Sequence, residues 1–246
     1  KLDRVQAELR QDGFESSALA CDIRDEEAVR AGVAEVAASR GRIHGLVNNA
    51  GGQFPAPLSA ISQKGFETVV RTNLTGGFLV AREVVTRSMA DGGGAVVNIV
   101  ADMWRGMPGM GHSGAARAGM LNLTRTMAVE WAPFGIRVNA VAPGWIASSG
   151  LDHYDEETRR TVIPRLAEAV PLKRLGTEAE VSAAICFLLS EAAAFVTGAC
   201  LQVDGAAPLF NPVFPSLPVQ RSAAFQGFHR AVVPEALRRP DGGDPP

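Results

Sequence analysis

Short runs of apolar residues alternate with longer amphipathic stretches along most of the chain. The apolar runs occupy residues 18–20, 43–47, 95–100, 137–142 and 199–203. Between them, apolar residues recur at helical spacing over residues 25–39, 63–90, 113–131, 155–170 and 177–191. Such alternation predicts strand–helix–strand units with right-handed crossovers. We therefore expect an α/β fold with a doubly wound parallel sheet, covered by helices on both faces.

Composition narrows the class of protein. The chain has 246 residues, of which 46% are apolar and 20% charged, enough to bury the core of one α/β domain. A formal charge of −2 argues against nucleic acid as a partner, and no apolar run approaches the roughly 18 residues that span a membrane. Three cysteines without paired spacing support neither a disulfide framework nor a metal site. We expect a cytoplasmic protein without a metal, a signal peptide or a membrane segment.

The last part of the chain differs in character. Residues 207–246 hold 8 of the 15 prolines and 4 of the 11 phenylalanines. Proline at this density forbids a long helix or a central strand. We expect a body at residues 1–205 and a proline-rich arm at residues 206–246. The arm either lies on the surface as a tail or anchors across a neighbouring subunit through its aromatic residues Phe210, Phe214, Phe225 and Phe228.

The candidate ligand site lies where the predicted strands end. In open α/β sheets, ligands bind beyond the carboxyl ends of the strands. Small, polar or glycine-rich segments stand there at residues 21–25, 48–52, 100–103 and 143–150. Glycine and other small residues allow the backbone to approach a flat ligand closely.

Several of these residues form a recognisable combination. It consists of Asn-Asn-Ala-Gly at residues 48–51, Asn73, Pro-Gly at 143–144 and Val-Asp-Gly at 203–205. Over residues 1–205 the chain thereby resembles the short-chain dehydrogenase/reductase family, which implies a Rossmann-type fold. The stretch His-Ser-Gly-Ala-Ala-Arg-Ala-Gly at 112–119, continued at 122–125 and 128–132, is similar to peroxisomal trans-2-enoyl-CoA reductases and their bacterial relatives. Dienoyl-CoA reductases are the next neighbours.

The resemblance implies a nicotinamide cofactor, NADPH or alternatively NADH, and residues that hold it. Arg117 takes the place of the family lysine that binds the nicotinamide ribose. The other implied cofactor contacts are Asp22 and Ile23 at the adenine, Asn49, Ala50 and Gly51 at the adenosine ribose, Pro143, Gly144 and Ile146 at the nicotinamide, and Ser148 at the pyrophosphate.

The chain departs from the family at its start. The family opens with a strand, a glycine-rich loop and a helix that hold the pyrophosphate. Residues 1–10 read instead as the helix that follows the second strand. We therefore expect the first βαβ unit, about 30 residues or more, to be missing from this sequence, which would be a fragment of a longer chain.

A second departure lies at the reaction centre. Ser113 stands where the family has a tyrosine, Arg117 replaces the lysine, and Val100 replaces a serine. The single tyrosine, Tyr154, falls in the variable segment at residues 145–175, which fits a lid over the substrate. Tyrosine beside an ammonium group serves as an acid–base near neutral pH, whereas serine is far weaker and arginine stays protonated. Ordinary alcohol–ketone interconversion is thus disfavoured.

Reduction of an enoyl thioester does not depend on such an acid–base residue. The negative charge that develops on the thioester oxygen needs aimed hydrogen-bond donors rather than a strong acid. Asn73, Ser113, Arg117 and the cofactor ribose are candidates for this role, and the resemblance implies that Asn73 holds a helix bulge and a catalytic water. His112 is the candidate for proton delivery. Alternatively, His112 only packs or caps, and Ser113 is an N-cap.

The expected function is an NADP(H)-dependent oxidoreductase that reduces the C=C bond of acyl-CoA-type thioesters in fatty acid metabolism. A dehydrogenase of branched or terpenoid alcohols, or a catalytically degenerate member that binds nucleotide or partner subunits, are the alternatives. An apolar acyl pocket is expected from Met103, Trp104, Met107 and Met110. By family analogy we expect a homo-oligomer, a dimer or tetramer, formed through the helices at 63–90 and 113–131.

Overall fold

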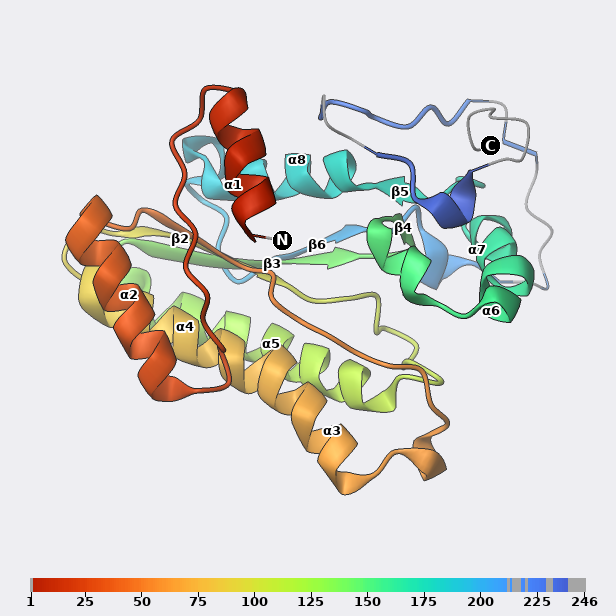
Figure 1. Ribbon diagram of the computed structural model, residues 1–246, viewed down its shortest axis with the longest axis horizontal. Helices are drawn as coiled ribbons and strands as arrows, with labels where there is room; N and C mark the ends of the chain where they lie inside the picture. The colour runs from red at the N-terminus through yellow and green to blue at the C-terminus, as the bar shows by residue number, and fades with distance from the viewer. Residues whose placement is uncertain (1, 212, 214–217, 220, 229–231, 239–246) are drawn as a thin grey trace.

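The computed structural model describes residues 2–211, 213, 218–219, 221–228 and 232–238. Its centre is a parallel sheet of four strands in the order β1-β2-β3-β6 (Figure 1). The strands are β1 (Gly45–Asn48), β2 (Gly94–Ile99), β3 (Ile136–Pro143) and β6 (Cys200–Val203). In this register Leu46 faces Val96, and Val96 faces Val138. Two short strands, β4 (Ile146–Ala147) and β5 (Gly176–Thr177), pair separately.

Helices cover both faces of the sheet because successive strand residues point to opposite sides. Val96 and Val138 pack with Met89 on one side, among residues of α4 (Gly77–Val84) and α5 (Gly111–Glu130). Val97 and Val141 pack on the other side against Leu188 of α8 (Glu178–Leu189). The expected doubly wound α/β architecture is confirmed.

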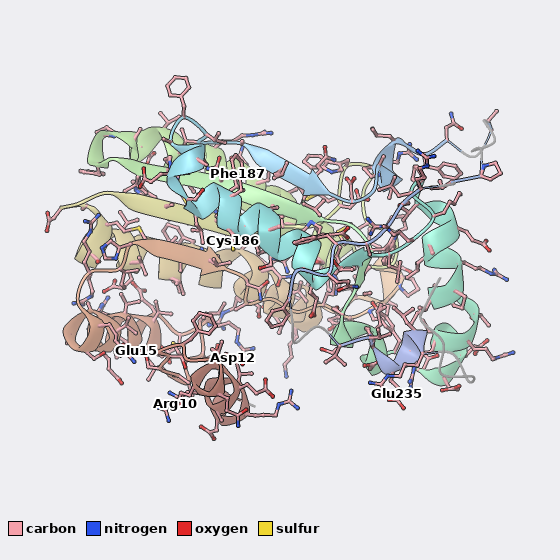
Figure 2. All side chains as sticks on the ribbon, turned by 90° about the horizontal axis from the view of Figure 1, so that it is seen from above. Arg10, Asp12, Glu15, Cys186, Phe187 and Glu235 are labelled. Atoms are coloured by element: carbon pink, nitrogen blue, oxygen red, sulfur yellow. The ribbon has the colours of Figure 1, made fainter. Side chains whose placement is uncertain are left out.

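The remaining helices flank these layers. α2 (Glu26–Arg40) lies beside α4, and α1 (Leu2–Gln11) lies on the same side of the sheet as α8 (Figure 1). Figure 2 shows α8 from above, crossing the sheet with Cys186 and Phe187 on it, while Arg10 of α1 lies at the edge of the molecule. No helix in the described part of the chain is long and apolar enough to cross a membrane.

Local sequence sets the helix starts. Asp25 accepts hydrogen bonds from the backbone of Glu27 and Ala28 at the start of α2. Thr177 and Glu180 form a reciprocal capping box at the start of α8. The helix expected at 155–170 is divided into α6 (Glu156–Thr161) and α7 (Ile163–Ala169), because Pro164 lacks the N–H that a continuous helix needs.

One expected element is absent, and another is present with a less uniform helical geometry than expected. The strand expected at residues 18–20 is wrong: this exposed segment is irregular. A strand needs a neighbouring strand to pair its backbone, and the described sheet places none beside it. The helix expected at 63–90 is helical throughout but not uniform: α3 (Gln63–Val70) and α4 are separated by a π-helical segment at Arg71–Gly76, and a second one follows at Val85–Met89.

The described parts of the arm at 206–246 lie against their own chain. The backbone N–H of Phe225 donates to Glu180 at 3.2 Å, and the Thr177 hydroxyl donates to the Phe225 carbonyl at 2.8 Å. Ala236 donates to Asp152 at 2.8 Å. Phe214 lies outside the described residues. Whether the arm also contacts a neighbouring subunit stays a prediction.

A buried polar chain links the sheet to α5 and generates a stability prediction. Asn98 receives a hydrogen bond from Asn48 and donates one to Thr124, both at 2.9 Å. Replacing Thr124→Val leaves a buried amide donor without its acceptor, so we expect the free energy of unfolding in urea to fall by about 1–3 kcal/mol. Thr126→Val, on the exposed side of the same helix, should change it by less than about 0.5 kcal/mol. Equal losses in the two variants would contradict this account.

Candidate active site

Three strand ends meet at one edge of the sheet. Because β1, β2 and β3 run parallel, the loops that follow them emerge on the same side (Figure 1). The loop after β1 begins at residue 49, the loop after β2 at residue 100, and Gly144 follows β3. The start of α5 and the π-helical segment at Arg71–Gly76 complete this edge.

Asn73 holds the loop after β1. It lies in the π-helical segment and is 3% exposed. Its Nδ2 donates to the Gly52 carbonyl and its Oδ1 accepts from the Gly52 N–H, both at 2.9 Å. The expected helix bulge at Asn73 is thus present, and π-turns of this kind occur frequently at functional sites. Both hydrogen bonds of the Asn73 amide go to the backbone of Gly52 in the loop after β1, here called the glycine loop. That Asn73 also holds a catalytic water stays a prediction.

Arg117 of α5 reaches back to the same loop. Its Nη1 donates to the Ile99 carbonyl at 2.6 Å, at the end of β2. A Cβ added at Gly51 would collide with Arg117 Nη2 and lie 2.9 Å from Asn73 Oδ1, so glycine at this position lets both side chains lie against the loop. Burial lowers the pKa of Arg117. Among the described residues, its Nε has no hydrogen-bond partner and no carboxylate pairs with the guanidinium. The site therefore contains an uncompensated cation, since arginine keeps its proton.

Gln53 and Phe54, which follow Gly52 in the loop after β1, contact the first turn of α5. The Ser113 hydroxyl, which is fully buried, donates to Gln53 Oε1 at 2.7 Å. The His112 ring packs edge-on against Phe54 with centroids 4.4 Å apart. Nδ1 of His112 accepts a hydrogen bond from the Ser113 backbone N–H at 2.9 Å, whereas no group in the described part of the chain binds its buried Nε2. Ser113 is not the N-cap, because α5 begins at Gly111 after Met110.

A cavity of about 400 Å³ opens beside Gln53. The loop after β2 lines it with Met107 and Met110, two of the four residues from which an apolar pocket was expected. The expected contributions of Met103 and Trp104 are wrong: Met103 packs into the core beside Met120, and Trp104 is 41% exposed. The full lining is Gln53, Ala101, Asp102, Arg105, Gly106, Met107, Pro108, Met110, Pro143, Gly144, Trp145, Ala169, Ala207, Pro208 and Phe210.

Phe210, a residue of the arm at 206–246, forms part of the wall of this cavity. Its carbonyl accepts from Arg105 Nη1 at 2.7 Å, and Lys173 Nζ lies 5.3 Å from the centre of its ring. From the sequence, Phe210 was expected either in a surface tail or in contact with a neighbouring subunit, and no link with this cavity was predicted. Asp102 faces the same cavity, where burial and, secondarily, the charge of Asp204 raise its pKa.

The structure brings together only some of the predicted site residues. Gly51, Asn73 and Arg117 are in mutual contact, and Ser113 joins them through Gln53. Pro143 and Gly144 line the cavity on its other side. Asn49 and Ala50 are exposed in the same loop.

The other predicted residues lie further out. Asp22 is exposed and binds Arg24 at 2.7 Å, a contact that holds the pKa of Asp22 at about 2. Ile23 packs against Gly76 at the far end of the π-helical segment. Ile146 pairs with Gly176 between β4 and β5, and Ser148 precedes the 3-10 turn at Ser149–His153. The described contacts of these residues do not involve Asn73, Ser113 or Arg117.

Comparison with known proteins assigns the family. A family model described as "Enoyl-(Acyl carrier protein) reductase" matches residues 1–206. The chain is a short-chain dehydrogenase/reductase. The family is one of nicotinamide-dependent oxidoreductases, in keeping with the Rossmann-type sheet of this chain. The family match ends before the segment that carries Phe210.

This short-chain dehydrogenase/reductase is similar to proteins of several specificities. It is 37% identical to a peroxisomal 2,4-dienoyl-CoA reductase of Danio rerio over 77% of this chain, and it spans 63% of that protein's length. A solved citronellol catabolism dehydrogenase of Pseudomonas aeruginosa PAO1 is 60% identical, with a TM-score of 0.74, covering 84% of this chain and 79% of that one. A gluconate 5-dehydrogenase of Burkholderia cenocepacia J2315 in complex with NADP and tartrate is 31% identical, with a TM-score of 0.77, covering 85% and 81%.

Adjacent glycines allow a matched test of the loop. Gly51→Ala places a methyl group against Arg117 and Asn73, whereas a Cβ at Gly52 meets nothing within 4 Å. We expect Gly51→Ala to displace the Arg117 side chain and to weaken NADPH binding about 10-fold or more, with Gly52→Ala near the parent value. Isothermal titration calorimetry with NADPH measures both. Equal affinities for the two variants would show that the contact of Gly51 with Arg117 does not shape the dinucleotide site.

Proposed function

We propose that this short-chain dehydrogenase/reductase uses NADPH to reduce the C=C bond of enoyl-CoA-type acyl thioesters. The observation that carries the proposal is the chemistry of the reaction centre. Around Asn73 the chain provides hydrogen-bond donors and a cation, and no tyrosine or lysine stands at α5. Tyr154 follows the 3-10 turn at Ser149–His153 and does not line the cavity. Stabilising an enolate requires donors, whereas interconverting an alcohol and a ketone requires an acid–base.

The residues present fit a nicotinamide dinucleotide at the sheet edge. Gly51 lacks a Cβ where one would collide, and the Arg117 cation keeps its Nε without a protein acceptor. Gly144 is equally confined, because a Cβ there would lie 2.8 Å from Asp204. Arg117 would hold the nicotinamide ribose, with Gly51 and Gly144 allowing close approach. Asp22, Ile23, Asn49, Ala50, Pro143, Ile146 and Ser148 are the further contacts proposed from family resemblance.

A reduced nicotinamide held at this edge of the sheet would supply a hydride for the β-carbon of the substrate. The chain stabilises the negative charge that then develops on the thioester oxygen. Arg117 contributes a fixed positive charge, and the pair Ser113–Gln53 contributes a polar contact at the cavity wall. Asn73 fixes the loop that carries Gln53, so it acts by positioning. His112 stays the proposed route for a proton, through its unpartnered Nε2.

The acyl chain would enter the cavity of about 400 Å³ between Met107, Met110 and Phe210. Thioether and aromatic surfaces suit a flexible hydrocarbon chain. The cytoplasm as compartment, a homo-oligomeric assembly, a dimer or tetramer, and a role in fatty acid metabolism are parts of the same proposal.

Enzyme assays test the function directly. Purified protein should oxidise NADPH in the presence of crotonyl-CoA or a longer enoyl-CoA, with formation of the saturated thioester. Asn73→Ala should reduce kcat by about 10-fold or more because the loop that it holds is released, and Asn122→Ala on the exposed side of α5 is the control. Absence of turnover at every chain length contradicts the proposal. NADPH binding without any turnover would favour the degenerate, non-catalytic alternative.

The second candidate is a dehydrogenase of branched or terpenoid alcohols. It is favoured by the 60% identity to the citronellol catabolism dehydrogenase. Reduction of NADP+ or NAD+ with citronellol, in the absence of activity on enoyl-CoA, would establish this candidate in place of the first.

Phe210 generates a separate prediction about substrate choice. Phe210→Ala removes an aromatic wall from the cavity, so kcat/KM for long or branched acyl chains should rise relative to short ones by about 10-fold. Phe225→Ala is the matched control, because Phe225 lies in the same arm and does not line the cavity. An unchanged ratio in Phe210→Ala would show that the arm does not bound the acyl site.

A further inference from the structure

Gln53 occupies the point where the loop after β1 meets the cavity. It follows Gly51 and Gly52, which Arg117 and Asn73 contact, and it lines the cavity together with Pro143 and Gly144. Sequence reasoning assigned no role to it. Its side chain is exposed to the cavity, whereas its partner Ser113 is fully buried behind it.

The hydrogen bond between the two side chains determines which group faces the substrate. A primary amide has one accepting oxygen and one NH2 group with two protons. Oε1 of Gln53 accepts from the Ser113 hydroxyl at 2.7 Å, so the only proton of that hydroxyl is already used. No acceptor within the described residues binds Nε2 of Gln53. The free donor at this wall is therefore the Gln53 amide rather than the Ser113 hydroxyl.

The backbone around Gln53 is held from both sides. Gly52 before it makes two hydrogen bonds with Asn73 at 2.9 Å. Phe54 after it packs on His112, and Ala56 donates to the Gly109 carbonyl at 2.7 Å. A donor on a fixed backbone, oriented by a second hydrogen bond, needs little reorganisation when charge develops in front of it.

We propose that Gln53 is a catalytic residue that donates a hydrogen bond from Nε2 to the carbonyl oxygen of the substrate, and that Ser113 is the positioning residue that fixes its amide. This inference deepens the proposed function and rests on it for the identity of the thioester. As the β-carbon gains hydride, the C=C electron pair shifts toward the carbonyl oxygen, which Gln53 and Arg117 stabilise together. The α-carbon then takes a proton through the His112 route of the proposed function, with solvent as its final source, and the carbonyl re-forms as the electron pair returns. Gln53 itself neither gains nor loses a proton.

Gln53→Glu provides a sharp test because it keeps the acceptor for Ser113 and removes the donor toward substrate. At neutral pH the carboxylate offers no proton and repels the developing charge, so we expect kcat to fall by about 100-fold. A protonated carboxyl regains one donor. The kcat of Gln53→Glu, measured as product formed, should therefore recover relative to the parent as pH is lowered from about 8 to about 5. Gln63→Glu, at the exposed start of α3, should follow the parent at every pH.

Ser113 variants separate positioning from direct contact. Ser113→Ala frees the Gln53 amide to rotate and should lower kcat with a smaller change in KM, whereas Ser113→Thr retains the hydroxyl and should restore part of the loss. A combined Ser113→Ala and Gln53→Glu variant should be no worse than Gln53→Glu alone, because Ser113 acts through Gln53. Fully additive losses would overturn the positioning role.

A binding measurement distinguishes failure of this inference from failure of the proposed function. Calorimetry with saturated butyryl-CoA and hexanoyl-CoA, in the presence of NADP+, should show weaker binding to Gln53→Leu than to the parent, with NADP+ affinity itself unchanged. If the parent reduces enoyl-CoA but Gln53→Glu keeps parental kcat at neutral pH, the role of Gln53 is wrong and the function stands. If the parent reduces no enoyl-CoA, the function fails. Equal acyl-CoA affinities in parent and Gln53→Leu then also overturn the role of Gln53.

Discussion

The side-chain amide of Asn73 makes both of its hydrogen bonds to the backbone of Gly52, and the candidate site is built outward from this contact. Asn73 lies in the π-helical segment, where the wider turn directs its side chain toward the glycine loop. With Gly52 fixed, Gly51 lies under Arg117 and Gln53 reaches Ser113. Four side chains from three elements thus depend on one glycine loop being held in place.

The character of this site is that of an electrostatic environment rather than an acid–base pair. Arg117 is partly buried, holds the Ile99 carbonyl and meets no described carboxylate. Such a charge is costly unless a ligand compensates it, and an anion or a developing oxyanion does so best. This property of Arg117 is the basis for proposing that the edge of the sheet stabilises a developing negative charge rather than exchanging a proton with an alcohol.

Sequence alone predicted the four strands of the sheet and most helices, because the buried strands β2 and β3 are nearly continuous apolar runs and because the helices carry apolar residues at helical spacing. The strand at 18–20 failed since pairing is a property of a neighbour, not of the segment itself. The π-helical turn at Asn73 has no distinct periodicity, and its bulge came only from family resemblance. Gln53 and Phe210 were missed as site residues because their roles arise from contacts across 60 and 105 residues of sequence.

Phe210 lines the cavity from a part of the chain that the family model does not match. The segment that matches the family model ends at residue 206, whereas Phe210, held by Arg105 and near Lys173, lies beyond it. The groups around Gly51 thus lie within the matched part of the chain, whereas one wall of the cavity is contributed from outside it. A substitution at Phe210 would therefore alter the shape of the cavity without touching the hydrogen bonds of the glycine loop or the Arg117 cation.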